Sequence, residues 1–267
     1  MLDILVPTFN RPAALALTLG SLLAQTCQDF RLLVADQSTL APSAADGQVL
    51  AVTRLLRAHG RPVQFIHRRR RRGMAEQRQF LLERAAAPYA LFLDDDLLLE
   101  PWVLEQLLSA IQRLGCGFVG SAVIGLSYLA DHRPHEQAIE FWEGPVLPEQ
   151  VQPGSPAWQR YRLHNAANLY HVQQRLGLAP GAPRPYKVAW VGGCVLYDTH
   201  KLRQAGGFSF WKDLPPSACG EDALAQLRVM ARFGGCGLVP SGVYHQELPT
   251  TLPDRSVNAP EYLEISR

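Results

Sequence analysis

The sequence lacks a long apolar segment and a hydrophobic leader. No stretch of about 18 apolar residues is present, as a membrane-spanning helix would require. The first residues, Met1-Leu2-Asp3, carry no basic side chain, and the apolar run at 4–7 is too short for the core of a signal peptide. We therefore expect a cytoplasmic protein, with peripheral contact at the inner face of the membrane as the alternative.

Cysteine pairs, lysine and net charge are also sparse. The five cysteines are scattered without a Cys-x-x-Cys pair, which argues against a disulfide framework and against a zinc site. Lysine occurs at three positions, so nearly all positive charge is arginine, whose side chain suits bidentate contacts with phosphate. Because the formal net charge is +2, we expect no general binding of nucleic acid.

Apolar sequence, in contrast, is plentiful and regularly spaced. The 267 residues are 47% hydrophobic, which fits one large domain or two halves that share a sheet. Strand-length apolar runs occupy residues 2–6, 30–35, 63–66 and 89–93. Helical patterns occupy residues 11–24, 49–58, 74–86, 101–114 and 222–233. This alternation predicts an α/β fold with a Rossmann-like, mainly parallel central sheet and helices on both faces.

Polar residues follow the predicted strands where each strand ends. In open α/β sheets ligands bind beyond the carboxyl ends of the strands. We therefore expect these side chains to gather at one edge: Thr8, Asn10, Asp36, the arginines at 68–72, and Asp94, Asp95 and Asp96.

The three adjacent acids are the strongest of these signals. Three carboxylates at a buried strand end repel one another unless a counter-charge is present. A divalent cation can supply that charge, and Mg²⁺ and Mn²⁺ prefer oxygen ligands. The alternative is a solvated turn that caps the next helix, which the apolar residues on both sides of the acids disfavour.

Other motifs are ambiguous when taken singly. Arginines at a helix start form a phosphate site or a solvated loop, and Arg78, one turn inside the helix, is the first candidate for phosphate. Asp36 could bind a base or ribose, or occupy a turn. Glu221 and Asp222 could serve chemistry or merely favour the helix dipole. His245 could be a metal ligand or a core histidine.

Taken in order along the chain, these motifs resemble glycosyltransferase family 2, whose members have the GT-A fold. The matching segments are 6–11, 34–38, 72–78, 92–96, 192–193, 205–208 and 220–222. The resemblance implies an inverting, metal-dependent transfer of sugar from a nucleotide-diphosphate sugar to a hydroxyl acceptor, such as a glycan or a lipid-linked group. It divides the chain into a nucleotide-sugar-binding half at 1–125 and an acceptor-binding half at 126–267, with an irregular excursion at 126–186.

The resemblance also assigns roles to individual residues. Mn²⁺ or Mg²⁺ would bind at Asp96, with Asp94 and His245 as further ligands. Asp222 would be the catalytic base, kept ionised by the helix dipole, and Glu221 would hold an acceptor hydroxyl or cap the helix. The residues expected to bind the nucleotide are Pro7, Thr8, Asn10, Arg11, Asp36, Arg72, Arg78, Asp94 and Asp95.

The donor implied by the resemblance is a UDP-sugar, because an acid at position 36 would face uracil. Two departures from the family pattern alter this region. Gln37 stands where many members have a second acid, and arginines stand at 68–72 where members usually have an asparagine before the glycine.

Two other function classes compete with glycosyl transfer. A sugar-phosphate nucleotidyltransferase would also use an α/β sheet, a metal and a nucleotide. Such enzymes usually carry a glycine-rich loop after the first strand, and the segment 8–12 contains no glycine. A non-enzymatic binder of nucleic acid or anionic membrane would depend on the arginine run alone.

Overall fold

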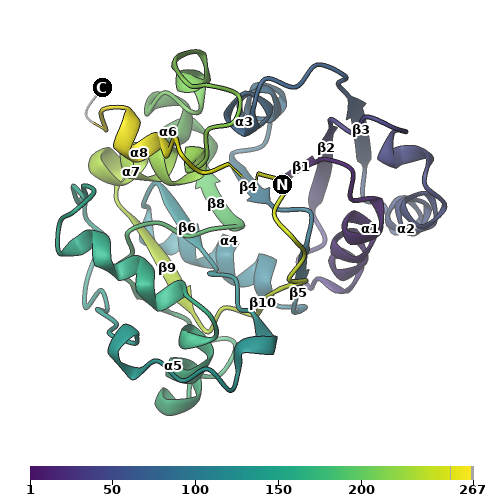
Figure 1. The fold of residues 1–267 in the computed structure, drawn as a ribbon. Coiled ribbons are helices and arrows are strands. Elements are labelled where there is room, and N and C mark those ends of the chain that lie inside the picture. Colours follow the sequence, from purple (N-terminus) through teal and green to yellow (C-terminus); the bar gives the residue numbers. More distant parts are fainter. Residues whose placement is uncertain (253, 266–267) are drawn as a thin grey trace.

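The first strand, β1 (Leu2–Thr8), is buried along its whole length and pairs in parallel on both sides. In the computed structural model, which describes residues 1–252 and 254–265, an eight-stranded sheet is built around it (Figure 1). The strand order is β3-β2-β1-β4-β8-β6-β9-β7. The other strands are β2 (Phe30–Asp36), β3 (Val63–His67), β4 (Tyr89–Leu93), β6 (Phe118–Gly120), β7 (Arg184–Tyr186), β8 (Cys194–Asp198) and β9 (Gly235–Val239).

Parallel pairing dominates the N-terminal part of the sheet, and antiparallel pairing enters with β8. Strand β8 lies antiparallel between β4 and β6, and β7 lies antiparallel to β9. A second, two-stranded sheet joins β5 (Leu97–Leu99) to β10 (Val243–His245). The mainly parallel α/β sheet expected from the sequence is therefore confirmed, and both predicted halves of the chain contribute strands to it.

Two apolar clusters cover the two faces of the sheet. Along β1, Ile4 and Val6 belong to one cluster and Leu5 belongs to the other, because successive side chains of a strand point to opposite faces. Helices α1 (Pro12–Ser21), α2 (Gly47–Ala58) and α4 (Val103–Leu114) contribute to the first cluster. Helices α3 (Met74–Arg84), α5 (Asn168–Leu176), α6 (Thr199–Gln204) and α7 (Glu221–Phe233) contribute to the second.

The segment 126–186 is irregular, as the sequence suggests. It contains the short 3₁₀ helices η3 (Leu126–Tyr128), η4 (Pro134–Glu136) and η5 (Ala157–His164) before α5. Further short helices are η1 (Leu22–Ala24), η2 (Ser43–Ala45), η6 (Ser209–Asp213) and α8 (Ala259–Tyr262). None of the helices in the described part of the chain is long and apolar enough to cross a membrane.

Candidate active site

A cavity of about 310 Å³ lies beyond the carboxyl ends of β1 and β4. These strands are parallel neighbours, so the residues that follow them share one edge of the sheet. The C-terminal segment after β10 closes the cavity from the other side. The lining residues are Pro7, Thr8, Phe9, Arg11, Met74, Asp94, Asp95, Asp96, His245, Leu248, Thr250, Thr251 and Arg255.

The three adjacent acids of this edge point to three different partners. The Thr8 hydroxyl donates to Asp95 Oδ2 at 2.6 Å. Arg11 Nη1 donates to Asp96 Oδ2 at 2.7 Å, whereas Asp94 Oδ1 accepts a hydrogen bond from Arg78. Each carboxylate therefore has a different hydrogen-bond partner, although all three acids line the same cavity.

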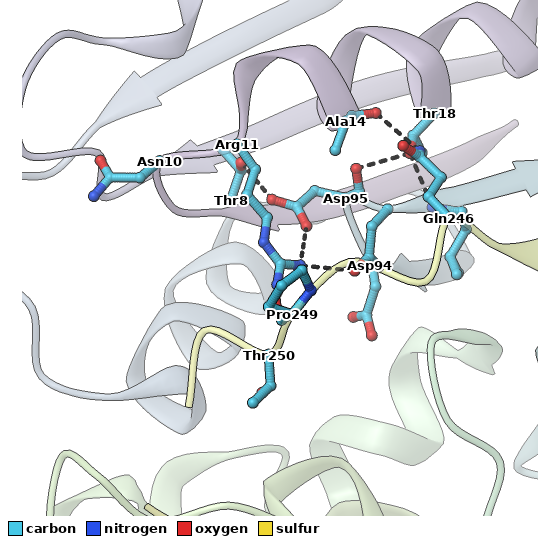
Figure 2. Close-up of polar contacts among 12 residues, drawn as sticks. Thr8, Asn10, Arg11, Ala14, Thr18, Asp94, Asp95, Gln246, Pro249 and Thr250 are labelled. Carbon is cyan, nitrogen blue, oxygen red and sulfur yellow. Dashed lines mark hydrogen bonds and ion pairs between the residues drawn. The ribbon is translucent and has the colours of Figure 1, made fainter. Parts of the chain in front are cut away.

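Arg11 is the cation that balances Asp95 and Asp96. Its Nη1 lies 3.6 Å from Asp95 Oδ1, and its side chain is 15% exposed. Its Nη2 donates to the carbonyl oxygen of Pro249, so the same guanidinium also ties down the C-terminal segment (Figure 2). In Figure 2, Arg11 reaches from the start of α1 to the acids, with Pro249 and Thr250 beside it. Arg11 therefore stands where a cation would neutralise the acids.

Burial makes ionisation of these acids unfavourable. It raises the pKa of Asp95 to about 7, against the opposing hydrogen bond from Thr8. Burial and the nearby charge of Asp94 also raise the pKa of Asp96. A further positive charge at this edge would favour the ionised form of both acids.

His245 faces Asp96 but presents the wrong ring atom for ligating a metal. Its Nε2 lies 3.4 Å from Asp96 Oδ2, and its Nδ1 accepts the backbone N–H of Glu247 at 2.7 Å. A neutral ring that accepts at Nδ1 carries its proton on Nε2, which then has no lone pair for a cation. In this arrangement His245 Nε2 only approaches Asp96, and the expected ligation would require the Glu247 contact to break.

Among the residues that the structure describes, the protein alone does not form a metal site. Within residues 1–252 and 254–265, no group of three or more His, Cys, Asp or Glu side chains is arranged to hold a metal ion. Divalent Mg²⁺, however, is commonly bound by one or two carboxylates together with substrate phosphates. Asp96 fits that arrangement because its carboxylate borders the cavity and is paired there with Arg11, whose side chain is 15% exposed.

Asp36 shapes its own loop. Its Oδ1 accepts the backbone N–H of Ser38 at 2.8 Å and its Oδ2 accepts that of Ser43 at 2.5 Å. The buried Nε2 of Gln37 has no hydrogen-bond partner in the described part of the chain. A base at this turn would thus meet a carboxylate that already accepts two backbone hydrogen bonds.

Asn10 holds the same loop from the neighbouring strand end. It has a left-handed φ of 53°, a conformation that asparagine tolerates better than most residues. Its Oδ1 accepts the backbone N–H of Thr39 at 2.9 Å. Asn10 therefore stabilises the loop after β2 through this hydrogen bond.

Within the arginine run, the residue nearest the cavity is not the one expected. The Cζ atom of Arg71 lies 3.6 Å from the ring centroid of Phe9, which lines the cavity. The Cζ atom of Arg72, in contrast, lies 5.7 Å from the ring centroid of Trp211. Sequence reasoning missed Phe9 and Arg71, although the aromatic residue inside the segment 6–11 was a usable signal.

Arg68 belongs to the structural part of the run. Its Nη1 and Nη2 atoms donate to the two carboxylate oxygens of Glu76 at 2.8 and 2.6 Å. Its guanidinium also lies over the ring of Phe80, with Cζ 3.8 Å from the centroid. This arginine anchors the loop to α3, so the run is not uniformly a solvated basic patch.

The acids at the start of α7 diverge, as their spacing predicts. Glu221 is buried, and its Oε1 accepts a hydrogen bond from Arg78 Nε at 2.9 Å. Asp222 Oδ1 accepts the backbone N–H of Ala223 at 2.8 Å, and its carboxylate borders a small cavity beside Phe92. Gly220 occupies the N-cap position, so Asp222 is the acid of this pair whose side chain accepts a backbone N–H of the first helical turn.

The expected protonation of Asp222 needs a correction. We expected the helix dipole to keep it ionised, but burial and the adjacent charge of Glu221 raise the pKa of Asp222 to about 7. Desolvation therefore outweighs the favourable dipole and the attraction of Arg78. A carboxylate with this pKa is a stronger base than an ordinary aspartate and is still half-ionised near neutral pH.

Comparison with known structures identifies the same fold in nucleotide-sugar enzymes. TarS from S. aureus, residues 1–349, in complex with UDP-GlcNAc, matches 94% of the chain at 15% identity and a TM-score of 0.53. The mannosyltransferase PcManGT from Pyrobaculum calidifontis, in complex with GDP-Man and Mn²⁺, matches 94% at 14% identity and a TM-score of 0.55. The chain spans 60% and 58% of the length of these two structures.

The sequence comparisons give the family. No individual curated protein sequence matches the chain at a significant level. The model of glycosyl transferase family 2, however, matches residues 3–171, which is more than half of the chain. The ordered motifs, the GT-A sheet and this match agree, and the chain belongs to glycosyltransferase family 2.

Proposed function

We propose that the protein transfers a sugar from a nucleotide-diphosphate sugar, with UDP-sugar as the first candidate, to a hydroxyl acceptor with inversion at the anomeric carbon. One observation carries the proposal. An acidic edge that borders a cavity of about 310 Å³ is joined through Arg78 to a second acidic pair at the start of α7. The first acid set suits a diphosphate and its cation, and the second suits an acceptor.

Two structural neighbours support the choice of donor class. The structures of TarS with UDP-GlcNAc and of PcManGT with GDP-Man show nucleotide sugars bound to this fold. We choose the uridine donor for this chain because Asp36 ends β2, and its carboxylate keeps acceptor sites for a base beside the two backbone hydrogen bonds that it accepts. Phe9, with Arg71 stacked on its ring, offers an aromatic surface beside the cavity.

We propose Asp96 as the residue that holds Mn²⁺ or Mg²⁺ together with the donor. When bound, such a cation neutralises the charge that develops on the leaving diphosphate. Arg11 would then exchange its contact with Asp96 for the donor phosphates, which a planar guanidinium binds well. Asp94 stays with Arg78, and His245 stays beside Asp96, with Nε2 3.4 Å from its carboxylate.

Asp222 is the proposed base. An acceptor hydroxyl has a pKa far above 7, so attack on the anomeric carbon needs a carboxylate that removes the proton as the bond forms. The buried position of Asp222 and its pKa of about 7 suit this role. Glu221 is engaged with Arg78, which leaves Asp222 as the acid of this pair that can turn to an acceptor.

A panel of ligands tests the proposed function directly. We expect UDP-sugars with Mn²⁺ to raise the melting temperature, GDP- and dTDP-sugars to do so less, and RNA to have no effect. Transfer to an acceptor library should give product of inverted anomeric configuration by NMR. Retention of the anomeric configuration would refute inversion. Tight binding of GDP or dTDP without binding of UDP would refute the UDP-sugar donor. Stabilisation by RNA alone would favour a non-enzymatic binder of nucleic acid.

A further inference from the structure

Arg78 is a buried cation that lies between the two acidic motifs of the site. It projects from α3, and its side chain is 6% exposed. Its Nη2 donates to Asp94 Oδ1 and its Nε donates to Glu221 Oε1, both at 2.9 Å. The contact thus joins the end of β4 to the start of α7.

The guanidinium of Arg78 uses one edge to contact two carboxylates. The Nε and Nη2 atoms form one edge, which commonly binds a single carboxylate with two parallel hydrogen bonds. Here that edge is divided between Asp94 and Glu221, which lie on different segments of the chain. Because the guanidinium is planar and rigid, it fixes the position of one carboxylate relative to the other.

We infer that Arg78 is a positioning residue that aligns the donor edge with the base-bearing helix, and that it does not bind the nucleotide. The inference rests on the proposed glycosyl transfer and deepens it. The sequence placed Arg78 in the nucleotide pocket, but its bridging edge is already occupied by two carboxylates. Among the described residues, Asp94 lines the larger cavity, whereas Arg78 lines a small separate one with Asp222.

The electrostatics agree with a permanent bridge. Burial alone would lower the pKa of Arg78, but Asp94 and Glu221 raise it further above its already high ordinary value. The cation therefore stays charged between acids that would otherwise repel one another. Phe92, two residues before Asp94 on the same face of β4, supports the guanidinium with its ring centroid 5.7 Å from Cζ.

A second restraint acts on Asp94 from the opposite side. Its backbone N–H donates to the carbonyl oxygen of Gly193 at 2.9 Å. Gly193 has a φ of +76°, and a side chain there would come within 2.8 Å of Val123. Asp94 is thus held both by its backbone and by its carboxylate, as a residue aligned by Arg78 should be.

Arg78→Lys tests the inference, because lysine keeps the charge but cannot bridge two carboxylates with a fixed geometry. We expect kcat for glycosyl transfer to fall by roughly 10-fold to 100-fold, because a small misplacement of reacting groups lowers the rate by this order. The Kd for UDP with Mn²⁺, measured by calorimetry without turnover, should stay within about twofold of the wild-type value. Arg84→Lys, on the exposed side of the same helix, is the matched control and should change neither quantity.

A second variant keeps the test decisive if Arg78→Lys folds poorly. Glu221→Gln weakens the same bridge from the other side, and its kcat should fall in the same direction. The double variant should lose less than the sum of the two single losses, because both changes break one contact. Wild-type kcat in Arg78→Lys, or a weakened Kd with kcat unchanged, would overturn the inference. Absence of transfer by the wild-type protein with every nucleotide sugar would instead overturn the proposed function.

Discussion

Both acidic motifs of the site are neutralised by an arginine, but the two arginines are held very differently. Arg11 contacts Asp95 and Asp96 at the rim of the cavity, and its second nitrogen is bound by a carbonyl of the C-terminal segment. Arg78 is buried on α3 and bridges the buried Glu221 to Asp94, whose side chain is 36% exposed at the cavity. This difference supports our proposals that Arg11 is an exchangeable counter-charge and that Arg78 is a permanent one beside the proposed base.

Removing the acid beside the exchangeable arginine should have the largest effect. Asp96→Asn should abolish turnover while leaving the fold intact, because the neutral amide cannot hold the cation and the diphosphate together. Assays of turnover with Mn²⁺ measure the loss of activity, and far-ultraviolet circular dichroism measures whether the fold is intact. Asp131→Asn, at the surface acid that pairs with Arg133, is the control and should stay active. Full activity of Asp96→Asn in excess EDTA would exclude the assigned role.

Removing the acid beside the permanent arginine should be the next most severe change. Asp222→Asn should lower kcat by roughly 100-fold or more, because the amide cannot accept the acceptor's proton. Donor and Mn²⁺ affinity, measured by calorimetry, should be nearly unchanged. If this variant turns over at a rate near that of the wild type, the base lies elsewhere, and Glu221 is the first position to examine.

The pH dependence of the reaction should report the buried environment of Asp222. Since its pKa is raised to about 7, kcat/KM should rise with pH and level off above about 7. An ordinary aspartate would give an acid limb near its usual value of 3.8. A profile that is already flat at pH 5 would show that this pKa does not control the reaction.

The exchangeable arginine should compete with the cation. Arg11→Gln removes a positive charge from Asp96, so Mn²⁺ should bind the donor-free protein more tightly, by roughly fivefold. Binding of UDP should weaken in the same variant, because the guanidinium is then missing from the phosphates. Titration of Mn²⁺ followed by electron paramagnetic resonance measures the first effect. Weaker Mn²⁺ binding would contradict an exchange of Arg11 for the metal.

The effect on stability should be the smallest, and its size should depend on pH. Between about pH 4 and pH 7 the folded protein keeps a proton on Asp222 that the unfolded chain has released, so rising pH lowers the free energy of unfolding. Asp222→Asn lacks this penalty. Its melting temperature should exceed that of the wild type at pH 8 and approach it at pH 4. Equal melting temperatures at both values would contradict the raised pKa.

Much of the fold could be predicted from local patterns. The runs at 2–6, 30–35, 63–66 and 89–93 became β1, β2, β3 and β4 with ends shifted by at most two residues. Apolar periodicity is a local property, and short connections between alternating elements leave few topologies. Strands β6 and β8 were harder to predict from the sequence. Strand β6 has only three residues, and β8 follows the break at Gly192-Gly193, so both give little periodic signal.

The sequence by itself determined the family, the sheet and the identity of the acids. The motifs and apolar runs that indicate them, and the order of these along the chain, can be read without knowing which distant residues meet. Only the tertiary structure decided how these acids are neutralised. Arg78 meets Glu221 across 143 positions, and Arg11 meets Pro249 across 238, so no local pattern could have paired them. The pKa of Asp222 was misjudged for the same reason, since burial depends on distant segments packing around it, whereas the helix dipole can be inferred from the helix alone.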